Sequence, residues 1–408
     1  MTKPITRHMP QFSELAQWLR PQMPNFNVVE RRLAQSVCVA DLRLAARKRT
    51  PRQVFDYVDG GADEEILLRR QYDAWDRVEF NPCVLRDVSK VDTSTTILGQ
   101  PAALPLVLAP TGFTRLAHTE GEGGAVRAAT AAGLPYALST MASTSIEDVA
   151  SEGAGGTLWF QLYVWRDRRR SEQFLERASR AGYRAVLLTV DTAVVGRRAR
   201  DLRNGFTIPP APSLNTFIEG LRHPAWSYDF LTTDPPRFAA LEGAPAPLET
   251  IARIFDPSVS WDDIKWIREF WKGPLLLKGI TRVDQAKRAV DDYGINGIII
   301  STHGGRQLDR QSLPLEVLPS IVDAVRDRAE VLLDGGVMNG GDIVAAVAFG
   351  ARAVLIGRAF LYGLMVGGER GVKRVLDILK DETTRAMQLL GVASLAELNR
   401  SFVRLRPR

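Results

Sequence analysis

The sequence is poor in cysteine and in histidine. Of its 408 residues, two are cysteines, Cys38 and Cys83, and four are histidines. Two cysteines cannot form a disulfide framework, so a reducing compartment is the expected environment. No C-x-x-C pair and no H-E-x-x-H sequence occurs, so no metal site is predicted. The absence of a G-x-S-x-G sequence argues against serine hydrolysis.

Long apolar runs are also missing. No uninterrupted apolar stretch approaches the ~20 residues of a membrane-spanning helix. The N-terminal sequence MTKPITRHMPQFSELAQWLR is polar and lacks the apolar region of a secretory signal. We therefore expect a cytoplasmic protein, with peripheral attachment to the inner face of the cell membrane as the alternative.

No single sign of charge dominates the chain. The 53 basic residues are scattered among 47 acidic ones, which gives a net charge of +6. A nucleic-acid-binding protein more often carries a basic stripe with interleaved aromatic residues, so no nucleic-acid partner is expected. A mildly basic surface suits an anionic substrate or an anionic membrane face and does not decide between them.

What the sequence does contain is a rhythm of short apolar runs that alternate with helical patterns. The runs cover residues 104–109, 135–139, 157–163, 185–190, 274–278, 297–301, 331–334 and 353–356. Continuous rather than alternating apolar strands indicate burial on both faces, and therefore a parallel sheet covered by helices. Eight such units predict an α/β fold, a closed (β/α)8 TIM barrel.

A doubly wound sheet is the alternative fold. It would place a G-x-G-x-x-G sequence between the first strand and its helix. The nearest sequence, GEGG at residues 121–124, lacks the last glycine and lies well past its strand, so it is interpreted as a helix start.

Two regions depart from the rhythm. Residues 1–80 predict an N-terminal helical segment packed on a barrel of residues 81–395, with 396–408 as a C-terminal tail. A long insertion, residues 199–260, follows the fourth strand, and loops of this length are usually functional or mobile. Its segment TFIEGLRHPAWSYDFL could touch a membrane with four aromatic side chains, and a lid or an oligomer contact is the alternative. These side chains are Phe217, Trp226, Tyr228 and Phe230.

Polar residues follow the apolar runs directly, at the end of the barrel where active sites are built. In the sequence STHGGRQLD, His303 follows a buried strand and Arg306 lies three residues on. A neutral imidazole beside a guanidinium is a general base next to an anion clamp, although a structural histidine is the alternative. Asp191 also follows a strand, and a carboxylate there could orient His303 and stabilise the imidazolium.

The remaining candidates suggest a bound cofactor. Lys278, at the end of the fifth run, either extends to solvent or offers a fixed charge to an electron-rich ring. The loops after the seventh and eighth runs contain DGGV and GRAF, and such loops often bind phosphate, with Arg358 as the expected ligand. Together these groups suggest redox chemistry on an α-hydroxy acid with a phosphorylated flat cofactor.

The motifs APTG, LSTM, WFQLYV, LTVDT, GRR, LLLKG, STHGGRQLD, DGGV and GRAFLYG occur in this order over about residues 30–395. As a set they resemble the FMN-dependent α-hydroxy-acid dehydrogenases and oxidases. The long aromatic insertion and LLGV near the C-terminus most resemble the bacterial flavin L-lactate dehydrogenases.

This resemblance implies a role for each matching residue. His303 would be the base and Asp191 its partner. Arg306 and Arg198 would hold the substrate carboxylate, although a solvated loop is the alternative for the GRRAR arginines. Tyr57 would assist them, and Tyr163 would hydrogen-bond the substrate hydroxyl.

The resemblance also implies FMN as the cofactor, with Lys278 facing the N1/O2 edge of its ring. Pro110, Thr111 and Gly112 would lie against the isoalloxazine ring. The other implied cofactor contacts are Ser139, Gln161, Thr189, Ser301, Asp334, Gly335, Gly336, Gly357 and Arg358.

Three residues depart from the family pattern. Met338 stands after DGGV, where the family usually has arginine, so one cation at the cofactor is missing. Met141 replaces the tryptophan of glycolate oxidase, and Gly112 replaces its alanine. The last two changes predict a substrate pocket that is roomier than glycolate needs.

The expected reaction is oxidation of an L-2-hydroxy acid, above all L-lactate to pyruvate, with electrons passing to a quinone or a cytochrome. The alternatives are an oxidase that uses oxygen, and an enzyme for mandelate-like or peptide-derived substrates. An inactive flavin-binding scaffold is less favoured, because the base, its partner and both arginines are present. An FMN-using isomerase is less favoured, because a paired carboxylate clamp suits diphosphate substrates poorly. The resemblance further implies a homotetramer, and the route of electron transfer, hydride or carbanion, stays open.

Overall fold

The computed structural model describes residues 26–206, 214–234, 238–239 and 255–407, together with Met9 and Gln11. Most of residues 1–25 therefore lie outside the described residues. So do parts of the insertion expected at 199–260, among them the proline-rich sequences around 207–213 and 240–254.

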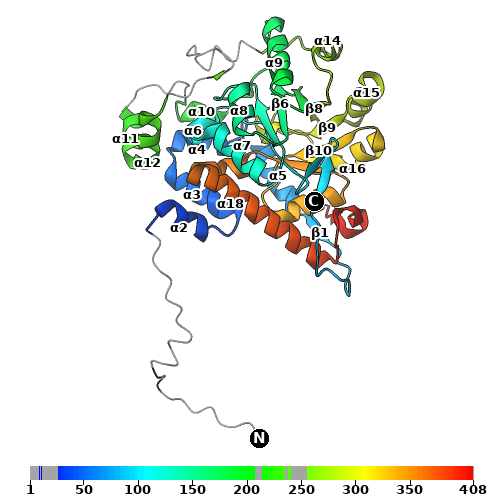
Figure 1. The fold of residues 1–408 in the computed structure, drawn as a ribbon, viewed down its shortest axis with the longest axis horizontal. Coiled ribbons are helices and arrows are strands. Elements are labelled where there is room, and N and C mark those ends of the chain that lie inside the picture. The colour runs from blue at the N-terminus through cyan, green and yellow to red at the C-terminus, as the bar shows by residue number, and fades with distance from the viewer. Residues whose placement is uncertain are drawn as a thin grey trace.

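Eight parallel strands close into a barrel in the order β10-β11-β4-β5-β6-β7-β8-β9 (Figure 1). Their bounds are β4 Leu106–Leu108, β5 Tyr136–Ser139, β6 Leu158–Leu162, β7 Ala185–Thr189, β8 Leu275–Ile280, β9 Gly297–Ile300, β10 Glu330–Asp334 and β11 Ala353–Ile356. Each strand falls on one of the eight apolar runs, so the predicted (β/α)8 barrel is confirmed and the doubly wound alternative is wrong.

Burial on both faces explains the continuous apolar runs. Leu187 and Leu276 belong to one buried cluster with Trp159, to which each of the eight strands contributes a residue. Their neighbours Leu188 and Leu277 belong to a second cluster that extends to the helices. Side chains therefore alternate between the barrel interior and the helix layer, as strands that are covered on both sides require.

The surrounding helices are α6 Thr114–Ala117, α7 Gly121–Ala131, α8 Ile146–Glu152, α9 Arg168–Arg180, α14 Asp263–Phe270, α15 Val283–Tyr293, α16 Pro314–Val325, α17 Gly340–Ala348 and α18 Arg358–Leu390. The GEGG sequence begins α7, as interpreted from the sequence. Short 3-10 helices are η2 His303–Gly305, η3 Arg326–Arg328, η4 Leu395–Glu397 and η5 Arg400–Phe402.

Helices make up most of the N-terminal segment from residue 28 to residue 75. Its helices are α2 Val28–Gln35, α3 Val39–Arg49, α4 Arg52–Asp59 and α5 Ile66–Trp75. The long helix α18 packs against α3 and α2, so segments from the two ends of the chain lie side by side (Figure 1). Tyr362 of α18 donates a hydrogen bond of 2.8 Å to Asp59 at the end of α4.

Two small antiparallel sheets complete the fold. The strand β1, Val78–Phe80, pairs with β12, Val403–Leu405, so the segment expected as a C-terminal tail is fixed against the first strand. The hairpin of β2, Thr95–Ile97, and β3, Gln100–Ala102, places Ile97 in the cluster that fills the barrel interior.

The described part of the insertion is helical, with α10 Ala199–Arg203, α11 Leu214–Arg222 and α12 Pro224–Thr232. In α12, Asp229 pairs at 2.7 Å with the buried Arg49, and Trp226 donates at 2.9 Å to the carbonyl of Leu116. The rings of Trp226 and Phe230 stack on each other. The four aromatic residues expected on one membrane-facing surface are therefore divided, because Trp226 and Phe230 are half-buried.

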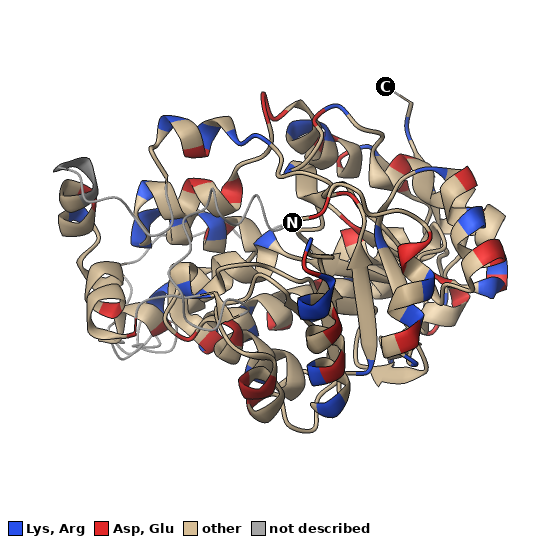
Figure 2. Ribbon diagram, turned by 90° about the horizontal axis from the view of Figure 1, so that it is seen from above, with Lys and Arg blue, Asp and Glu red and all other residues tan. Residues whose placement is uncertain are grey.

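No helix within the described residues is long and apolar enough to cross a membrane. In the view of Figure 2, Lys and Arg are interspersed with Asp and Glu along the helices.

Candidate active site

A cavity of about 400 Å3 opens at the carboxyl ends of the barrel strands. Barrel enzymes build their sites at this end, and the size is in the range of cofactor and ligand pockets. The sequence-predicted residues that line it are Tyr57, Pro110, Thr111, Gly112, Ser139, Met141, Gln161, Tyr163, Thr189, Arg198, Lys278, His303, Arg306, Asp334, Gly335, Gly336, Gly357 and Arg358. The two other candidates, Asp191 and Ser301, are buried directly behind this lining.

His303 and Asp191 form a pair. The Nδ1 atom of His303 lies 3.1 Å from Oδ1 of Asp191, which also accepts a 3.0 Å hydrogen bond from the Thr192 hydroxyl. Burial alone would raise the pKa of Asp191, but the charge and hydrogen bond of His303, with the charge of Lys278, hold it below its ordinary value. An ionised Asp191 favours the tautomer in which Nδ1 carries the proton, so Nε2 presents its lone pair to the cavity.

The backbone of His303 is unusual. Its φ is +57°, in the left-handed region that side-chain-bearing residues seldom occupy. Its N–H donates to the Ser301 hydroxyl at 3.0 Å, and the following Gly304 and Gly305 also have positive φ. The tight η2 turn fixes the direction of the imidazole, and strained backbone of this kind is often found at functional sites.

Tyr163 stands beside the base. Its hydroxyl lies 3.3 Å from Nε2 of His303. Burial, with the nearby charge of Asp191, raises the pKa of this phenol well above its ordinary value. The hydroxyl therefore stays protonated and can donate a hydrogen bond to a substrate oxygen.

Positive charge gathers around the ring of Tyr57, in the wall of the same cavity. The guanidinium carbons of Arg306 and Arg198 lie 5.0 and 5.6 Å from the centre of the Tyr57 ring. Burial, with repulsion from Arg198 and Arg358, lowers the pKa of Arg306 to about 10. A bound anion would relieve this crowding, and paired guanidinium groups match the geometry of a carboxylate.

The guanidinium of Arg358, which the sequence predicts as a phosphate ligand, makes backbone contacts at the edge of the cavity. It donates to three backbone carbonyls, those of Val58, Gly60 and Gly304, at 2.9, 2.7 and 2.7 Å. The side chain thus ties α4 to the His303 turn. Its backbone begins α18, with Gly357 as the N-cap, and the N–H groups at a helix start are suited to bind a phosphate.

Lys278 is a buried cation in the cavity wall. Its Nζ lies 2.5 Å from Oδ2 of Asp334 and donates to the Ser301 hydroxyl at 2.8 Å. The other carboxylate oxygen of Asp334 is buried and has no hydrogen-bond partner among the described residues. It can accept a hydrogen bond from a hydroxyl of a bound ligand.

Ser139, Gln161 and Thr189 form a chain of hydrogen bonds across three neighbouring strands. Ser139 donates to Oε1 of Gln161 at 3.0 Å, and Nε2 of Gln161 donates to the Thr189 hydroxyl at 2.9 Å. These side chains line the cavity and offer both donors and acceptors to a flat heterocycle.

The cavity therefore fits FMN. Its polar chain suits the heteroatoms of an isoalloxazine ring, Lys278 supplies a positive charge, and the unsatisfied Asp334 oxygen suits a ribityl hydroxyl. Gly336 has a φ of +81°, and a Cβ there would lie 2.8 Å from Nε1 of Trp75, so the backbone beside the cavity must be glycine. Met338 also lines the cavity, and it offers no cation to a phosphate.

Gly112 and Met141, which the sequence predicts to widen the pocket, lie against each other. A Cβ on Gly112 would lie 3.1 Å from Cβ of Met141. Sequence reasoning missed two aromatic residues of the insertion, Phe238 and Phe255, which line the same cavity. Phe238 meets Phe113 edge to face, and Phe255 contacts the ring of Tyr163. The sequence shows that the insertion is rich in proline and aromatic residues. It does not show that these two side chains point into the cavity.

A base held by a buried carboxylate, beside arginines and a cofactor-sized cavity, is an arrangement typical of oxidoreductases that act on small carboxylic acids. A family model described as FMN-dependent dehydrogenase matches residues 46–405, and the chain belongs to this family. It is an enzyme of the FMN-dependent 2-hydroxy-acid dehydrogenase family, and its cofactor is FMN.

Relatives agree on the chemistry and differ in acceptor and substrate. The chain is 48% identical over 396 residues to a Mycobacterium tuberculosis protein named "Putative L-lactate dehydrogenase", covering 97% of this chain and 95% of that protein. It is 43% identical to an L-lactate oxidase of Nostoc sp., covering 88% of this chain and 96% of that protein. A crystal structure of the monotopic membrane protein (S)-mandelate dehydrogenase superposes with a TM-score of 0.87 at 38% identity, covering 91% of this chain and all, 100%, of that one.

Proposed function

We propose that this enzyme oxidises an L-2-hydroxy acid, with L-lactate as the principal substrate, and passes the electrons to a quinone or a cytochrome. The observation that supports this most is that one cavity brings together His303, paired with Asp191 and beside Tyr163, and the arginines Arg306 and Arg198. Proteins named L-lactate dehydrogenase from Mycobacterium tuberculosis and Caulobacter vibrioides are among the relatives.

In the proposed reaction the arginines bind the substrate carboxylate, assisted by Tyr57. This anchors the 2-carbon near Nε2 of His303, and Tyr163 donates a hydrogen bond to the substrate hydroxyl. Nε2 takes a proton from the substrate, and the resulting imidazolium is stabilised by the ionised Asp191 at 3.1 Å. FMN, when bound, would take up the two electrons and the second hydrogen of the substrate, so that the 2-hydroxy acid leaves as a 2-oxo acid.

The residues around the FMN site supply a positive charge and apolar walls. Lys278, paired with Asp334, holds a positive charge in a buried position where charge is weakly screened. The walls made by Met141, Phe238 and Phe255 are apolar and suit the side chain of a 2-hydroxy acid.

The test is an anaerobic substrate panel followed by flavin absorbance. The purified holoenzyme should be yellow, and L-lactate should bleach it faster than D-lactate, glycolate or (S)-mandelate. A protein that carries FMN but is bleached by none of these acids would contradict the proposal. Faster bleaching by mandelate would transfer the assignment to the larger acid.

The acceptor needs a separate measurement, because relatives include enzymes named as dehydrogenases and as an oxidase. Reduced enzyme should pass electrons to a quinone analogue or to cytochrome c much faster than to oxygen. Stoichiometric hydrogen peroxide at a comparable rate would make the protein an oxidase.

A second proposal concerns location: the exposed side of α11 and α12 contacts a membrane surface. Phe217 and Leu221 of α11 are 65% and 66% exposed, and Tyr228 and Leu231 of α12 are 69% and 78% exposed. These helices lie at the edge of the molecule (Figure 1). The similar (S)-mandelate dehydrogenase structure is titled as a monotopic membrane protein.

A further inference from the structure

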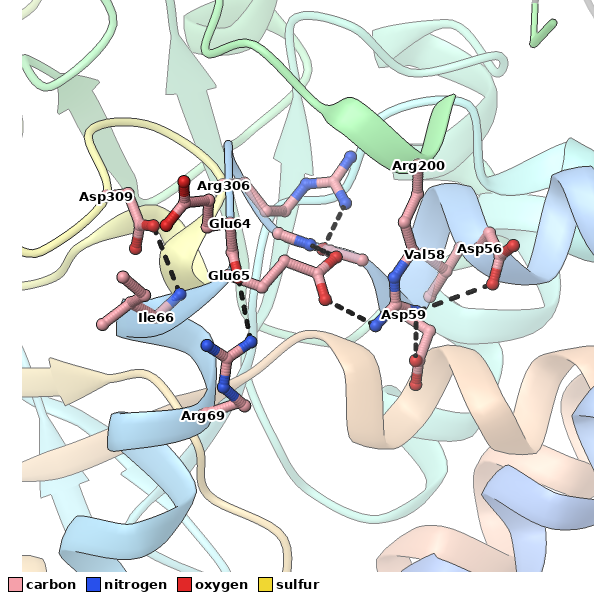
Figure 3. Close-up of polar contacts among 12 residues, drawn as sticks. Asp56, Val58, Asp59, Glu64, Glu65, Ile66, Arg69, Arg200, Arg306 and Asp309 are labelled. Carbon is pink, nitrogen blue, oxygen red and sulfur yellow. Dashed lines mark hydrogen bonds and ion pairs between the residues drawn. The ribbon is translucent and has the colours of Figure 1, made fainter. Parts of the chain in front are cut away.

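Arg200 lies in the short helix α10, two residues after Arg198, which is the N-cap of that helix, and it is not part of the cavity lining. Its guanidinium sits among three carboxylates of the N-terminal segment (Figure 3). Nη1 lies 3.0 Å from Oδ2 of Asp59 and 3.5 Å from Oδ1 of Asp56, and Nη2 lies 2.6 Å from Oε2 of Glu65. One side chain thus joins α10 to α4 and to the start of α5.

The main acceptor is rigidly held. Asp59 is 4% exposed and also binds Nε and Nη2 of Arg43 at 2.6 and 3.0 Å, and the Tyr362 hydroxyl at 2.8 Å. Burial alone would raise the pKa of Asp59, but hydrogen bonds from Arg43, Tyr362 and Arg200 lower it to about 2. Arg200 is therefore fastened to an ionised and immobile group.

The segment that Arg200 binds, α4 with the turn that follows it, contains part of the proposed substrate site. Tyr57 lies two residues before Asp59, and its backbone carbonyl accepts a hydrogen bond from Nη1 of Arg306. Glu65, the second acceptor, receives the N–H of Gly61 at 3.0 Å and so holds the turn after α4. On the α10 side, Arg200 lies two residues from Arg198. On the α4 side, Asp59 lies two residues from Tyr57, and both Arg198 and Tyr57 line the cavity.

We propose that Arg200 is a positioning residue that sets the spacing between Arg198 and Tyr57, and thereby the affinity of the site for the substrate carboxylate. This inference rests on the proposed function. The guanidinium groups of Arg198 and Arg306 lie 5.6 and 5.0 Å from the centre of the Tyr57 ring, so a shift of α10 against α4 moves Arg198 relative to Tyr57 and Arg306. Small displacements of this kind weaken binding strongly, because paired guanidinium recognition depends on geometry.

Removal of the bridge should loosen the spacing without detaching α10. Neutral contacts remain, because Asn204 donates to Asp56 at 2.7 Å and Gln53 donates to the carbonyl of Asn204 at 2.7 Å. Among the described residues, Arg200 makes the ion pairs that join α10 to α4.

The experiment measures oxalate binding to the FMN-loaded enzyme by flavin difference absorbance, together with KM and kcat. Oxalate presents a carboxylate with an adjacent oxygen, as a 2-hydroxy acid does, but has no hydrogen to lose. Arg200→Met should raise the Kd for oxalate and the KM for the acid about 10-fold, with a smaller fall in kcat and unchanged FMN content. An unchanged Kd would overturn the proposal.

Arg43→Met is the matched control. Arg43 binds the same carboxylate of Asp59 but comes from α3 and does not reach α10. It should lower Tm as Arg200→Met does, while the Kd for oxalate stays within about 2-fold of the wild type. An equal rise in Kd for both variants would show that Asp59 itself matters, and not the bridge.

A double-mutant cycle supplies a readout that a merely structural role would not move. In an Arg198→Met background, Arg200→Met should raise the Kd no further, since the group it positions is gone. Additive effects would overturn the proposal. If Arg200→Met does not fold, Arg200→Lys decides, because one point charge cannot span two carboxylates; an intermediate Kd supports the bridge and a wild-type Kd overturns it.

The two levels of inference can fail separately. Wild-type enzyme that binds oxalate but is bleached by no 2-hydroxy acid would refute the proposed function, and the Kd values would still judge Arg200. Wild-type enzyme that does not bind oxalate would refute the carboxylate site and the role of Arg200 together.

Discussion

The imidazole of His303 reaches over a strand to meet its partner. Asp191 follows β7 and His303 follows β9, with β8 and Lys278 between them, yet Nδ1 and Oδ1 lie 3.1 Å apart. The buried carboxylate fixes one tautomer and leaves Nε2 facing the cavity.

Replacement of His303 by glutamine should leave FMN bound and abolish most of the substrate-driven bleaching. Glutamine can keep a hydrogen bond to Asp191 but cannot take a proton. We expect the rate of flavin reduction to fall by about 10²–10⁴-fold, the usual contribution of a general base. Stopped-flow absorbance under anaerobic conditions measures it, and bleaching at the wild-type rate would remove His303 from this role.

Asp191→Asn should preserve the fold and slow reduction for a different reason. An asparagine amide can donate to Nδ1 and so select the wrong tautomer, and it no longer stabilises the imidazolium. We expect a fall of at least about 10²-fold in the reduction rate, with a much smaller change in the Kd for oxalate. A large loss of oxalate binding with normal reduction would contradict the assigned pairing.

Lys278→Met should lower the reduction potential of the bound flavin. The substitution removes a buried cation and leaves the Asp334 carboxylate without its ion pair, so negative charge near the flavin becomes less favourable. Potentiometric titration and FMN content measure the effect. Lys272→Met, an exposed lysine just before β8, is the control and should change neither quantity.

The depressed pKa of Asp59 predicts a pH-dependent stability. The carboxyl is ionised in the folded protein down to about pH 2, against an ordinary pKa of 3.8. Its contribution to the free energy of unfolding is therefore complete above pH 3.8 and is lost as the pH falls toward 2. A shift of nearly two units corresponds to about 2 kcal/mol.

Denaturant unfolding of the wild type and Asp59→Asn across this pH range tests the prediction. The difference in unfolding free energy should be largest near neutral pH and should shrink between pH 4 and pH 2. A difference that is constant across this range would show that the ionised form of Asp59 contributes nothing.

Membrane contact is testable by sedimentation with vesicles that contain anionic lipid. Phe217→Ser combined with Leu221→Ser should release the protein from the vesicles, because it removes exposed apolar area from α11. Leu389→Ser, at a residue of α18 that is 74% exposed, is the control and should bind as the wild type does. If the double variant instead changes only the oligomeric state, this face joins copies of the chain.

The sequence predicted the barrel because its signal is local. Each strand is a continuous apolar run. The polar residues that end or follow these runs, such as Lys278 and Asp334, therefore lie at the same end of the barrel. The sequence does not predict the direction of a side chain that is fixed by partners far away in the chain. The sequence predicts Arg358 as a phosphate ligand, and it gives no sign that the guanidinium also donates to the carbonyls of residues 58, 60 and 304.

The bridge of Arg200 shows the same limit. Its partners Asp56, Asp59 and Glu65 lie 135 or more positions earlier in the chain, and no periodicity connects them. The space beside Gly112 likewise depends on Met141, which a comparison of single positions cannot reveal.

The contact of Tyr362 with Asp59 joins residues 303 positions apart, and so ties the earliest part of the site to the last helix. During translation, the segment with Tyr57 and Asp59 leaves the ribosome long before Tyr362, which binds Asp59, has been synthesised. A nascent chain that stops before α18 would hold every proposed catalytic side chain and still lack a finished carboxylate clamp. The contact between the start and the end of the site therefore forms only after residue 362 has been synthesised.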